Sequence, residues 1–397
     1  AGLPKEPTED TRFTFDFNLK RTDLITEILV PQLSEFDPGR FSARFKSQEN
    51  KLDVNLSLHH LTYSGVSVDS FKLMSSSEQN LLSSSFTIDR IHSANTEVNN
   101  LALKTALENN ELATKLSLKD STGRYQYLIK GLFQSIDSLY QFTLSTDSLS
   151  LAYEKWAVDQ SSTFLIDPSG GNDNVNLKIS NKGQKIDIET NASDTNLEIG
   201  FNQFQLTTLS EAVRNNEELI SGELNGQLTL IFPDSTLGVL ADLNINQLSV
   251  LKKKWGDFKL NIEQQNQTNY AALLRLISSR NDLEAKAVYD LANINDLQLT
   301  LDVQKFQLAT VAPILRENIK DLTGVLSGQI SLDGGFSTPD LNGSLKFSET
   351  KFNPVALYNT LSVDQEDITL KIQSSYSMSS SYLISKIIPP ISTEISN

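Results

Sequence analysis

Histidines are the first side chains to consider for chemistry, and the chain of 397 residues has three of them. His59 and His60 are adjacent, so on a strand they point to opposite faces of the sheet and cannot bind one metal ion together. His92 stands alone, and no third ligand lies at the spacing of a zinc site. We therefore interpret the three histidines as ordinary strand residues and predict neither a metal site nor a cofactor.

An oxygen-rich loop is the second candidate for a metal site. Its candidate ligands are Asp167, Asn172, Asp173 and Asn174, within the stretch DPSGGNDN. Their spacing does not match a calcium loop, in which the ligands alternate along the chain. Gly, Asn and Asp are also the residues that hairpin turns prefer, so we interpret the stretch as a turn.

Nucleophiles and phosphate-binding loops are not indicated by the sequence. Serine is abundant, but there is no G-x-S-x-G motif, and a serine without a paired base is inert. Carboxylates are scattered along polar strand faces rather than paired. Several glycines lie inside alternating strand patterns, where bends or close strand packing explain them better than a phosphate cradle. They are Gly222, Gly226, Gly324, Gly328 and Gly343. We predict no catalytic residues and a protein that is not an enzyme.

One basic run, Lys252 to Lys254, precedes Trp255. A contact with a lipid headgroup and a solvated turn beside an anchoring aromatic side chain both fit this run. We favour the turn, because short basic runs are usually just exposed.

Composition and charge limit the kinds of partner and chemistry that the chain can have. The net charge of −15 repels phosphate backbones, so we expect no nucleic-acid partner. The absence of cysteine excludes disulfides and thiol chemistry. No stretch reaches the roughly 18–20 apolar residues of a membrane span and no signal peptide opens the chain, so we expect membrane contact to come through regions outside it.

Period-two alternation of apolar and polar residues dominates the chain and predicts strands with one apolar face. A one-sided sheet must bury its apolar face, either against protein or as a groove around something else. With few helices to cover it, we predict an all-β fold: an elongated antiparallel β-taco or β-helix-like repeat array with a hydrophobic groove and a few short helices. The predicted lipid-binding groove residues are Phe13, Phe15, Phe17, Val54, Leu56, Leu58, Val175, Leu177, Ile179, Ile186, Ile188, Leu197, Ile199, Phe201, Leu228, Leu230, Phe258, Leu260, Ile262, Leu297, Leu299 and Leu301.

An internal repeat positions these strands. Residues 204–230 (FQLTTLSEAVRNNEELISGELNGQLTL) align without a gap on 306–332 (FQLATVAPILRENIKDLTGVLSGQISL). Each copy reads as a strand end, a short helix and a strand opened by glycine. We place Ser210 as the N-cap of the first helix, Pro313 in the first turn of the second, and Ile319 on the second helix.

The repeat suggests how the chain is divided. We predict an N-terminal β section at 1–194, with a degenerate third copy of the repeat at 17–45 whose helix lies around 24–30. Two β repeat sections follow at 195–296 and 297–372, and an irregular tail at 373–397.

The glycine-punctuated run LTGVLSGQISLDGGFSTPDLNGSLKFSETKF at 322–352 resembles the middle to C-terminal part of the TamB family, the translocation and assembly module within the AsmA-like bridge-type lipid transfer proteins. The resemblance extends over about 150–370 in its strand pattern. Two features depart from the family pattern: no N-terminal membrane anchor is present, and the sequence after Ile372 lacks the expected glycine-punctuated strands.

The resemblance implies a location and a function. The location would be the periplasm of a Gram-negative bacterium, in association with the inner or outer membrane. The function would be a conduit whose hydrophobic groove carries phospholipid acyl chains between the two membranes. Family members end near an Omp85-type outer-membrane barrel, but the divergent tail does not support carrying that contact over to it.

Two alternatives remain open at this point. The chain would act as a chaperone-like module that helps outer-membrane β-proteins assemble with an Omp85-type barrel, by adding a strand at an open edge. Otherwise it would be a surface adhesin whose apolar face is filled by its own side chains.

Overall fold

The computed structural model describes residues 11–18, 22, 26, 30, 32–37, 39–78, 80–93, 96–169, 173–191, 196–210, 219–231, 238–334, 340–355, 360–363 and 366–372. The chain divides into two compact units, which we call unit 1 (residues 1–219) and unit 2 (residues 220–397) and describe separately. The described part is antiparallel β-sheet with a few short helices, so the predicted all-β class is confirmed. Within the described ranges, no helix is long and apolar enough to cross a membrane.

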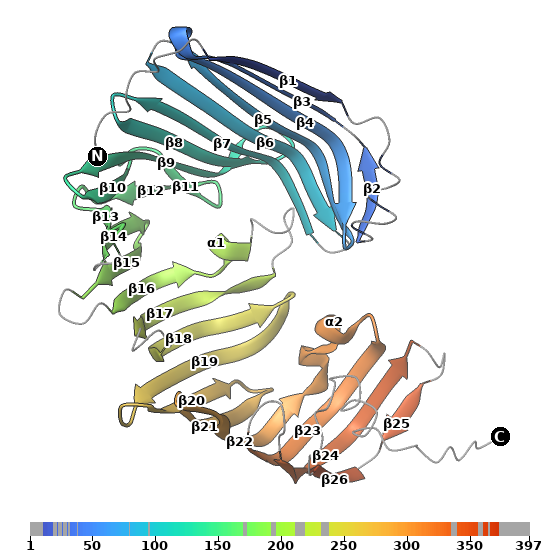
Figure 1. Ribbon diagram of the computed structural model, residues 1–397. Helices are drawn as coiled ribbons and strands as arrows, with labels where there is room; N and C mark the ends of the chain where they lie inside the picture. The colour runs from blue at the N-terminus through green and yellow to red at the C-terminus, as the bar shows by residue number, and fades with distance from the viewer. Residues whose placement is uncertain are drawn as a thin grey trace. The chain divides into compact units, whose positions relative to one another are not determined.

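Unit 1 is a ladder of strands in chain order, with local exceptions (Figure 1). Its strands are β1 (Arg12–Asn18), β2 (Leu33–Asp37), β3 (Arg40–Lys46), β4 (Lys51–Tyr63), β5 (Val66–Glu78), β6 (Leu81–Ser93), β7 (Thr96–Glu108), β8 (Glu111–Lys119), β9 (Tyr125–Ile136), β10 (Leu139–Leu144), β11 (Leu149–Leu151), β12 (Glu154–Val158), β13 (Thr163–Ile166), β14 (Asn174–Asn181), β15 (Gln184–Thr190) and β16 (Leu197–Gln205). Its helices are η2 (Ser47–Glu49) and α1 (Thr207–Ser210).

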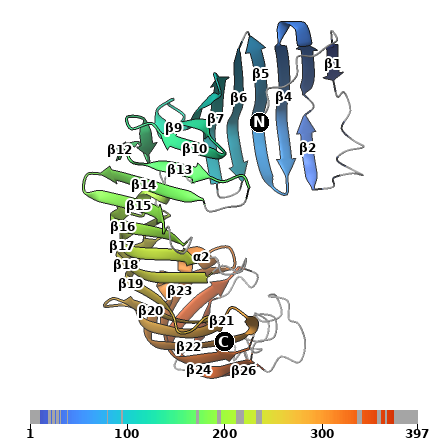
Figure 2. The same cartoon turned by 60° about the vertical axis from the view of Figure 1, so that its left-hand side comes forward.

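The exceptions to chain order are broken strands. β3 pairs with the first half of β4, and β2 pairs with its second half, so the two share one side of β4; β1 pairs with β3 (Figure 2). Between β9 and β14, the short strands β10 and β11 pair with β9, while β13 and β12 pair with β14. In each case two short strands occupy the place of one long strand, so the sheet continues without a gap.

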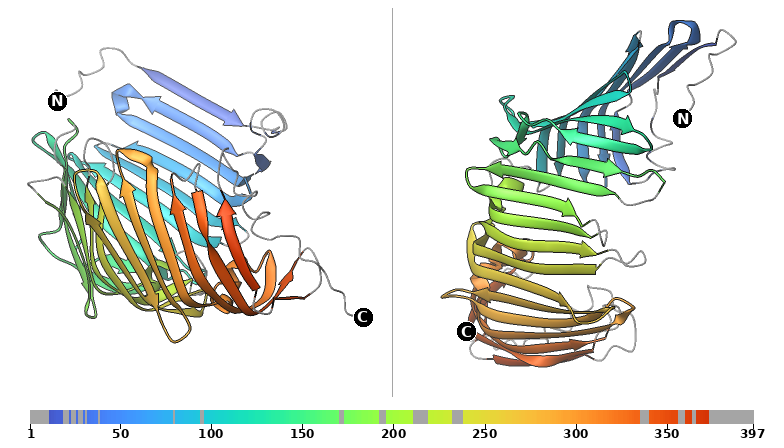
Figure 3. Two further views of the ribbon diagram at one scale, coloured as in Figure 1. Left: turned by 90° about the horizontal axis from the view of Figure 1, so that it is seen from below. Right: turned by 90° about the vertical axis from the view of Figure 1, so that its left-hand side faces the viewer.

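Unit 2 is a second antiparallel ladder, whose strands run from yellow to red in Figure 3. Its elements are β17 (Ile220–Ile231), β18 (Gly238–Val250), β19 (Lys253–Gln264), β20 (Asn269–Ile277), β21 (Asp282–Asp290), β22 (Asn293–Gln307), η4 (Leu308–Thr310), α2 (Ala312–Leu315), β23 (Ile319–Asp333), β24 (Asp340–Pro354), β25 (Leu361–Val363) and β26 (Glu366–Ile372). β25 and β26 both pair with β24.

Tight two-residue turns hold the neighbouring strands in register. Both central residues have positive φ at Ser64-Gly65, Asn109-Asn110 and Lys182-Gly183. This is the conformation of the type I′ turn, whose twist matches that of the flanking strands. Asn and Gly adopt positive φ at low cost, which explains why hairpins form at these points of the sequence.

The helical segments differ from the prediction in their boundaries. α1 begins at Thr207 and contains Ser210, so Ser210 is not its N-cap; residues 211–218 lie outside the described residues. Pro313 lies in the first turn of α2, as predicted, but Ile319 is the first residue of β23 and not part of the helix. Backbone pairing with β24 takes over at Ile319, which faces Pro354.

The predicted sections at 1–194, 195–296 and 297–372 remain a prediction. The expected helix of the third repeat copy, around 24–30, lies largely outside the described residues, as does the predicted tail at 373–397.

Candidate functional site

The candidate site is the apolar face of the sheet, which we call the apolar wall. Residues that lie directly opposite each other in adjacent antiparallel strands point to the same face. The register can therefore be followed from strand to strand to show which side chains share a face. In both units, the predicted groove residues fall on one such face.

In unit 1, an uninterrupted apolar row crosses the strands from β1 to β9, skipping β2. Each member lies opposite the next in the register, and the row ends in β9. Its members are Phe17, Phe41, Leu56, Leu73, Phe86, Leu103, Leu116 and Ile129. With strands about 4.8 Å apart, the row is about 34 Å long. Phe13, Phe15, Val54 and Leu58 lie on the same face by alternation along β1 and β4.

A second stretch of the wall covers β14 to β16. Leu177 faces Ile188, which faces Ile199. The remaining predicted residues of these three strands join this face through their own pairings or by alternation. They are Val175, Ile179, Ile186, Leu197 and Phe201.

The wall is open at its N-terminal end. The side chains of Phe13, Phe15 and Phe17 are 49%, 49% and 50% exposed. Phe13 and Phe15 contact rings of β3, with Phe15 and Phe41 centroids 5.4 Å apart. Such a row of half-exposed aromatic side chains is unusual for a soluble surface, where large apolar patches mark binding sites.

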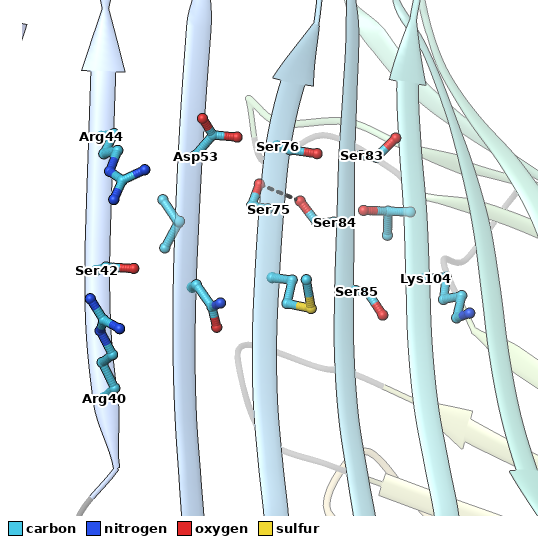
Figure 4. Close-up of a pocket in the computed structure, with 14 residues that line it drawn as sticks. Arg40, Ser42, Arg44, Asp53, Ser75, Ser76, Ser83, Ser84, Ser85 and Lys104 are labelled. Atoms are coloured by element: carbon cyan, nitrogen blue, oxygen red, sulfur yellow. Dashed lines mark hydrogen bonds between the residues drawn. The ribbon is translucent and has the colours of Figure 1, made fainter.

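A hydroxyl row interrupts the wall between β5 and β8. Ser75, Ser84, Thr105 and Thr114 lie opposite one another in turn, beside the apolar row. The Ser75 and Ser84 hydroxyls are 2.8 Å apart and hydrogen-bonded (Figure 4). In unit 1 a polar row therefore runs beside the apolar row on the same face.

The wall is closed where α1 lies. The Tyr127 hydroxyl of β9 donates a hydrogen bond to the backbone oxygen of Thr208 in α1. Phe204, which is 1% exposed, and Trp156, which is 3% exposed, have ring centroids 6.1 Å apart. Here the protein's own side chains fill the apolar face.

Unit 2 carries the same kind of wall. Leu228 faces Ala241, and the register then continues strand by strand to β24 without a polar residue. The complete row is Leu228, Ala241, Ile262, Ala272, Ala287, Leu299, Leu332 and Leu341. The other predicted residues, Leu230, Phe258, Leu260, Leu297 and Leu301, lie on this face in flanking rows.

The helical segment closes one end of the unit 2 wall. η4 and α2 contact β23, and η4 also contacts β19. Phe306, Leu308 and Thr310 are buried there, and Phe306 lies edge-on to Trp255 with ring centroids 6.1 Å apart. The equivalent residues of the first repeat copy, Phe204, Leu206 and Thr208, are also buried. The repeat therefore marks two places where the chain's own side chains cover the wall.

A buried asparagine holds this closure and was not predicted from sequence. Asn281 is 0% exposed; its amide donates to the Trp255 backbone oxygen at 2.8 Å, and its Oδ1 accepts from the Gln307 backbone N–H at 3.0 Å. In unit 1, Asn181 donates to the Lys155 oxygen, one residue before Trp156. The shared signal is a tryptophan about fifty residues before each FQL motif, 48 in one copy and 51 in the other.

The opposite face is polar, and most of the residues that line the cavities of β3 to β8 lie on it. One cavity of about 690 Å³ extends over β3 to β7. Figure 4 shows Arg40, Arg44 and Lys104 among the serines that line it. Arg40 forms an ion pair with Asp16, and this guanidinium holds the pKa of Asp16 below its usual range.

The histidines are more connected than their spacing suggests. His60 Nδ1 lies 2.6 Å from Asp69 Oδ1, and its Nε2 lies 2.9 Å from Glu35 Oε2 of β2. The pKa of His60 is raised, mainly by its hydrogen bond to Asp69 and to a smaller extent by its hydrogen bond to Glu35. His92, isolated in the sequence, lies 3.7 Å from Asp69.

No described group of three or more His, Cys, Asp and Glu side chains is arranged to hold a metal ion. In the loop at 167–174, Asp167 Oδ1 accepts hydrogen bonds from the Ser169 backbone and hydroxyl, and Asp173 accepts one from the Asp167 backbone. These bonds cap a turn. Asn172 lies outside the described residues.

The basic run belongs to a hairpin. Leu251 and Lys252 have positive φ between β18 and β19, and Lys252, Lys253 and Lys254 are exposed. Trp255 points to Phe306 and the closure.

The fold and the wall define a class of protein: antiparallel β proteins whose sheet presents one apolar face. A family profile described as TamB, N-terminal domain, matches residues 10–347. The chain therefore belongs to the TamB family. The predicted family is confirmed, but the matched region is the N-terminal domain rather than the middle to C-terminal part. Searches of curated proteins and of solved structures found no match.

Membership assigns a role at a coarse level. The TamB family is a transport and assembly module of the Gram-negative envelope, associated with lipid or protein transport and with an Omp85-type partner. It is not known as a family of enzymes.

Proposed function

We propose that the chain is a section of a periplasmic conduit that carries phospholipid between the inner and outer membranes along its apolar wall. The observation that supports this most strongly is the unbroken apolar register across eight strands of each unit.

Energetics favour such a role. Burying a methylene group stabilises by about 0.8 kcal/mol, so an acyl chain lying on the wall is held by several kcal/mol. Along a row of similar side chains this energy changes little from strand to strand. The lipid is therefore bound and can still move by diffusion, while its polar headgroup stays in water.

The remaining parts of the proposal come from the family resemblance. They are the association with the inner or outer membrane and an Omp85-type barrel as a partner. A protein client in place of lipid is the alternative, and the experiment below separates the two.

Photocrosslinkers placed on the two faces test the proposal directly. Amino acids that crosslink under light are introduced in cells at Phe201, Leu260 and Leu299 on the wall. Matched controls are their chain neighbours Asn202, Lys259 and Gln298, which are exposed and point to the other face. We expect phospholipid adducts at the three wall positions and none at the controls.

Two results would count against the conduit. One is that folded wall variants capture no lipid. The other is that Phe201→Asp, Leu260→Asp and Leu299→Asp proteins stay folded and transport lipid normally. Polypeptide adducts at the wall positions would favour the assembly-chaperone alternative.

A further inference from the structure

A second feature, on the polar face of unit 1, has no role in the conduit. Three lysines of β7 and β8 surround a cavity of about 220 Å³: Lys104, Lys115 and Lys119. Lys104 and Lys115 lie directly opposite each other in adjacent strands. Like charges in this arrangement destabilise a sheet.

Carboxylates do not balance these lysines. Asp89, which is exposed, is the one carboxylate among the residues lining the cavity. No described ion pair involves Lys104, Lys115 or Lys119. Lys130, the next lysine in the row, is not among the residues that line this cavity. The local excess of positive charge is unexpected in a chain with a net charge of −15.

Two of the three lysines, Lys115 and Lys119, are held in place by an aromatic side chain, whereas Lys104 is exposed. Lys115 Nζ donates a hydrogen bond of 2.9 Å to the Tyr125 hydroxyl and lies 5.0 Å from the centre of its ring. Lys119 Nζ lies 4.7 Å from the same ring. Lys115 and Lys119 are both half-buried, and the floor of the cavity includes Ser117, which is 5% exposed. A rigid aromatic ring thus gathers two cations beside a third.

We propose that this cavity binds a phosphate group. Clustered ammonium groups without carboxylate partners, two of them half-buried here, are complementary to a compact anion with several acceptor oxygens. The neighbouring hydroxyls of Ser117, Thr87 and Tyr125 supply further hydrogen-bonding groups. The cavity is on the polar face, so this site is separate from the acyl-binding wall and does not depend on it.

Titration calorimetry of the whole chain with inorganic phosphate and with glycerol 3-phosphate tests the site. The double variant Lys104→Gln/Lys115→Gln removes two of the cations and leaves side chains of similar length. The control is Lys182→Gln, because Lys182 is a lysine of unit 1 that already forms an ion pair with Glu154, at 2.8 Å. Circular dichroism checks that each variant keeps its β-sheet.

The expected result is saturable binding to the wild type that weakens with salt. Loss of charge-assisted hydrogen bonds should weaken it about tenfold or more in the double variant, with the control unchanged. A parallel arm measures sedimentation with equimolar phosphatidylglycerol and phosphatidylcholine vesicles. Binding to those vesicles alone, lost in the double variant, would assign the phosphate to a lipid headgroup; binding to the soluble esters would assign it to a free phosphate compound.

The proposal is overturned if the wild type binds neither the soluble phosphates nor the vesicles. It is equally overturned if the folded double variant binds as well as the wild type. Neither outcome affects the crosslinking result at the apolar wall, so the two proposals stand or fall separately.

Discussion

At the scale of single residues, His60 connects β2 to the rest of unit 1. It contacts Glu35 of β2 on one side and Asp69 of β5 on the other, and Arg90 also pairs with Asp69 at 2.9 Å. The edge strand β2 is therefore attached to β4 partly through a histidine, whose charge depends on pH.

This contact should make the attachment of β2 depend on pH. The pKa of His60 is raised from 6.5, so its contribution to stability is complete below about pH 6.5 and is lost as the pH rises through the raised value. The pKa values of Asp69 and Glu35 are lowered, so their contribution is lost only at acidic pH, as the pH falls through those lowered values.

Amide hydrogen exchange of residues 33–37, corrected for intrinsic rates, is the measurement. We expect stronger protection at pH 6 than above the raised pKa of His60, and no such difference in His60→Gln. Equal protection at both pH values in the wild type would refute the electrostatic role of His60.

Asn281 is the residue on which the closure of unit 2 depends most. Asn281→Leu would leave the Gln307 N–H without its partner and would remove one of the two hydrogen bonds that the Trp255 oxygen accepts, the other coming from the Ser278 hydroxyl. A buried unpaired polar group costs about 1–3 kcal/mol. We expect a clear fall in the midpoint of thermal unfolding. Gln298→Leu, an exposed position on β22, serves as the control and should change the midpoint little. If both variants unfolded at the wild-type temperature, the Asn281 hydrogen bonds would not contribute to the stability of the protein.

At the scale of elements, glycines in unit 2 permit the close approach of strands. Gly328 in β23 has φ of +129°, and a Cβ there would lie 2.2 Å from the Ser344 backbone oxygen. Gly226, its equivalent in the first repeat copy, has φ of +121°, with the Asp242 oxygen 1.9 Å from the Cβ position. The repeated glycines thus serve strand packing, as the sequence pattern indicated.

Gly328→Val should therefore destabilise unit 2 by about 2 kcal/mol or more, because valine strongly disfavours that backbone conformation and would displace β24. Ser327→Val, one residue earlier on the polar face opposite Lys346, is the matched control. Chemical denaturation of the two variants gives the comparison. A Gly328→Val protein as stable as the control would show that the strand approach is not required.

Sequence alone was informative about strands and faces, and weak about contacts across strands. Alternation placed Leu228, Ile262 and Leu299 on one face, because period two is a local property of each strand. It could not show that His92 lies beside Asp69, or that Lys104 lies opposite Lys115. Those contacts depend on the register between strands, which turns and bulges set.

The same limit applies to the closures. The repeat indicated where the helical segments lie, but the second helix was predicted to be too long, because backbone pairing of β23 begins at Ile319. The contact of Trp255 with Phe306 joins residues 51 positions apart, and no local pattern encodes it.

At the scale of the whole molecule, each unit is a sheet with two different faces. One face presents an apolar wall, which the chain itself covers near α1 in unit 1 and near η4 and α2 in unit 2. The other face is polar and carries ion pairs, cavities and the lysine cluster. This asymmetry is what a lipid conduit in water requires: the cargo lies on one side and solvent on the other.

The central claim, that the apolar wall holds phospholipid, is tested most directly by mass spectrometry of the gently purified protein. We predict bound phospholipid on the wild type and on Gln298→Asp, and a marked loss on Leu299→Asp, although the two substitutions are adjacent in the chain. Wild-type protein free of phospholipid, or equal retention by the two variants, would contradict the account.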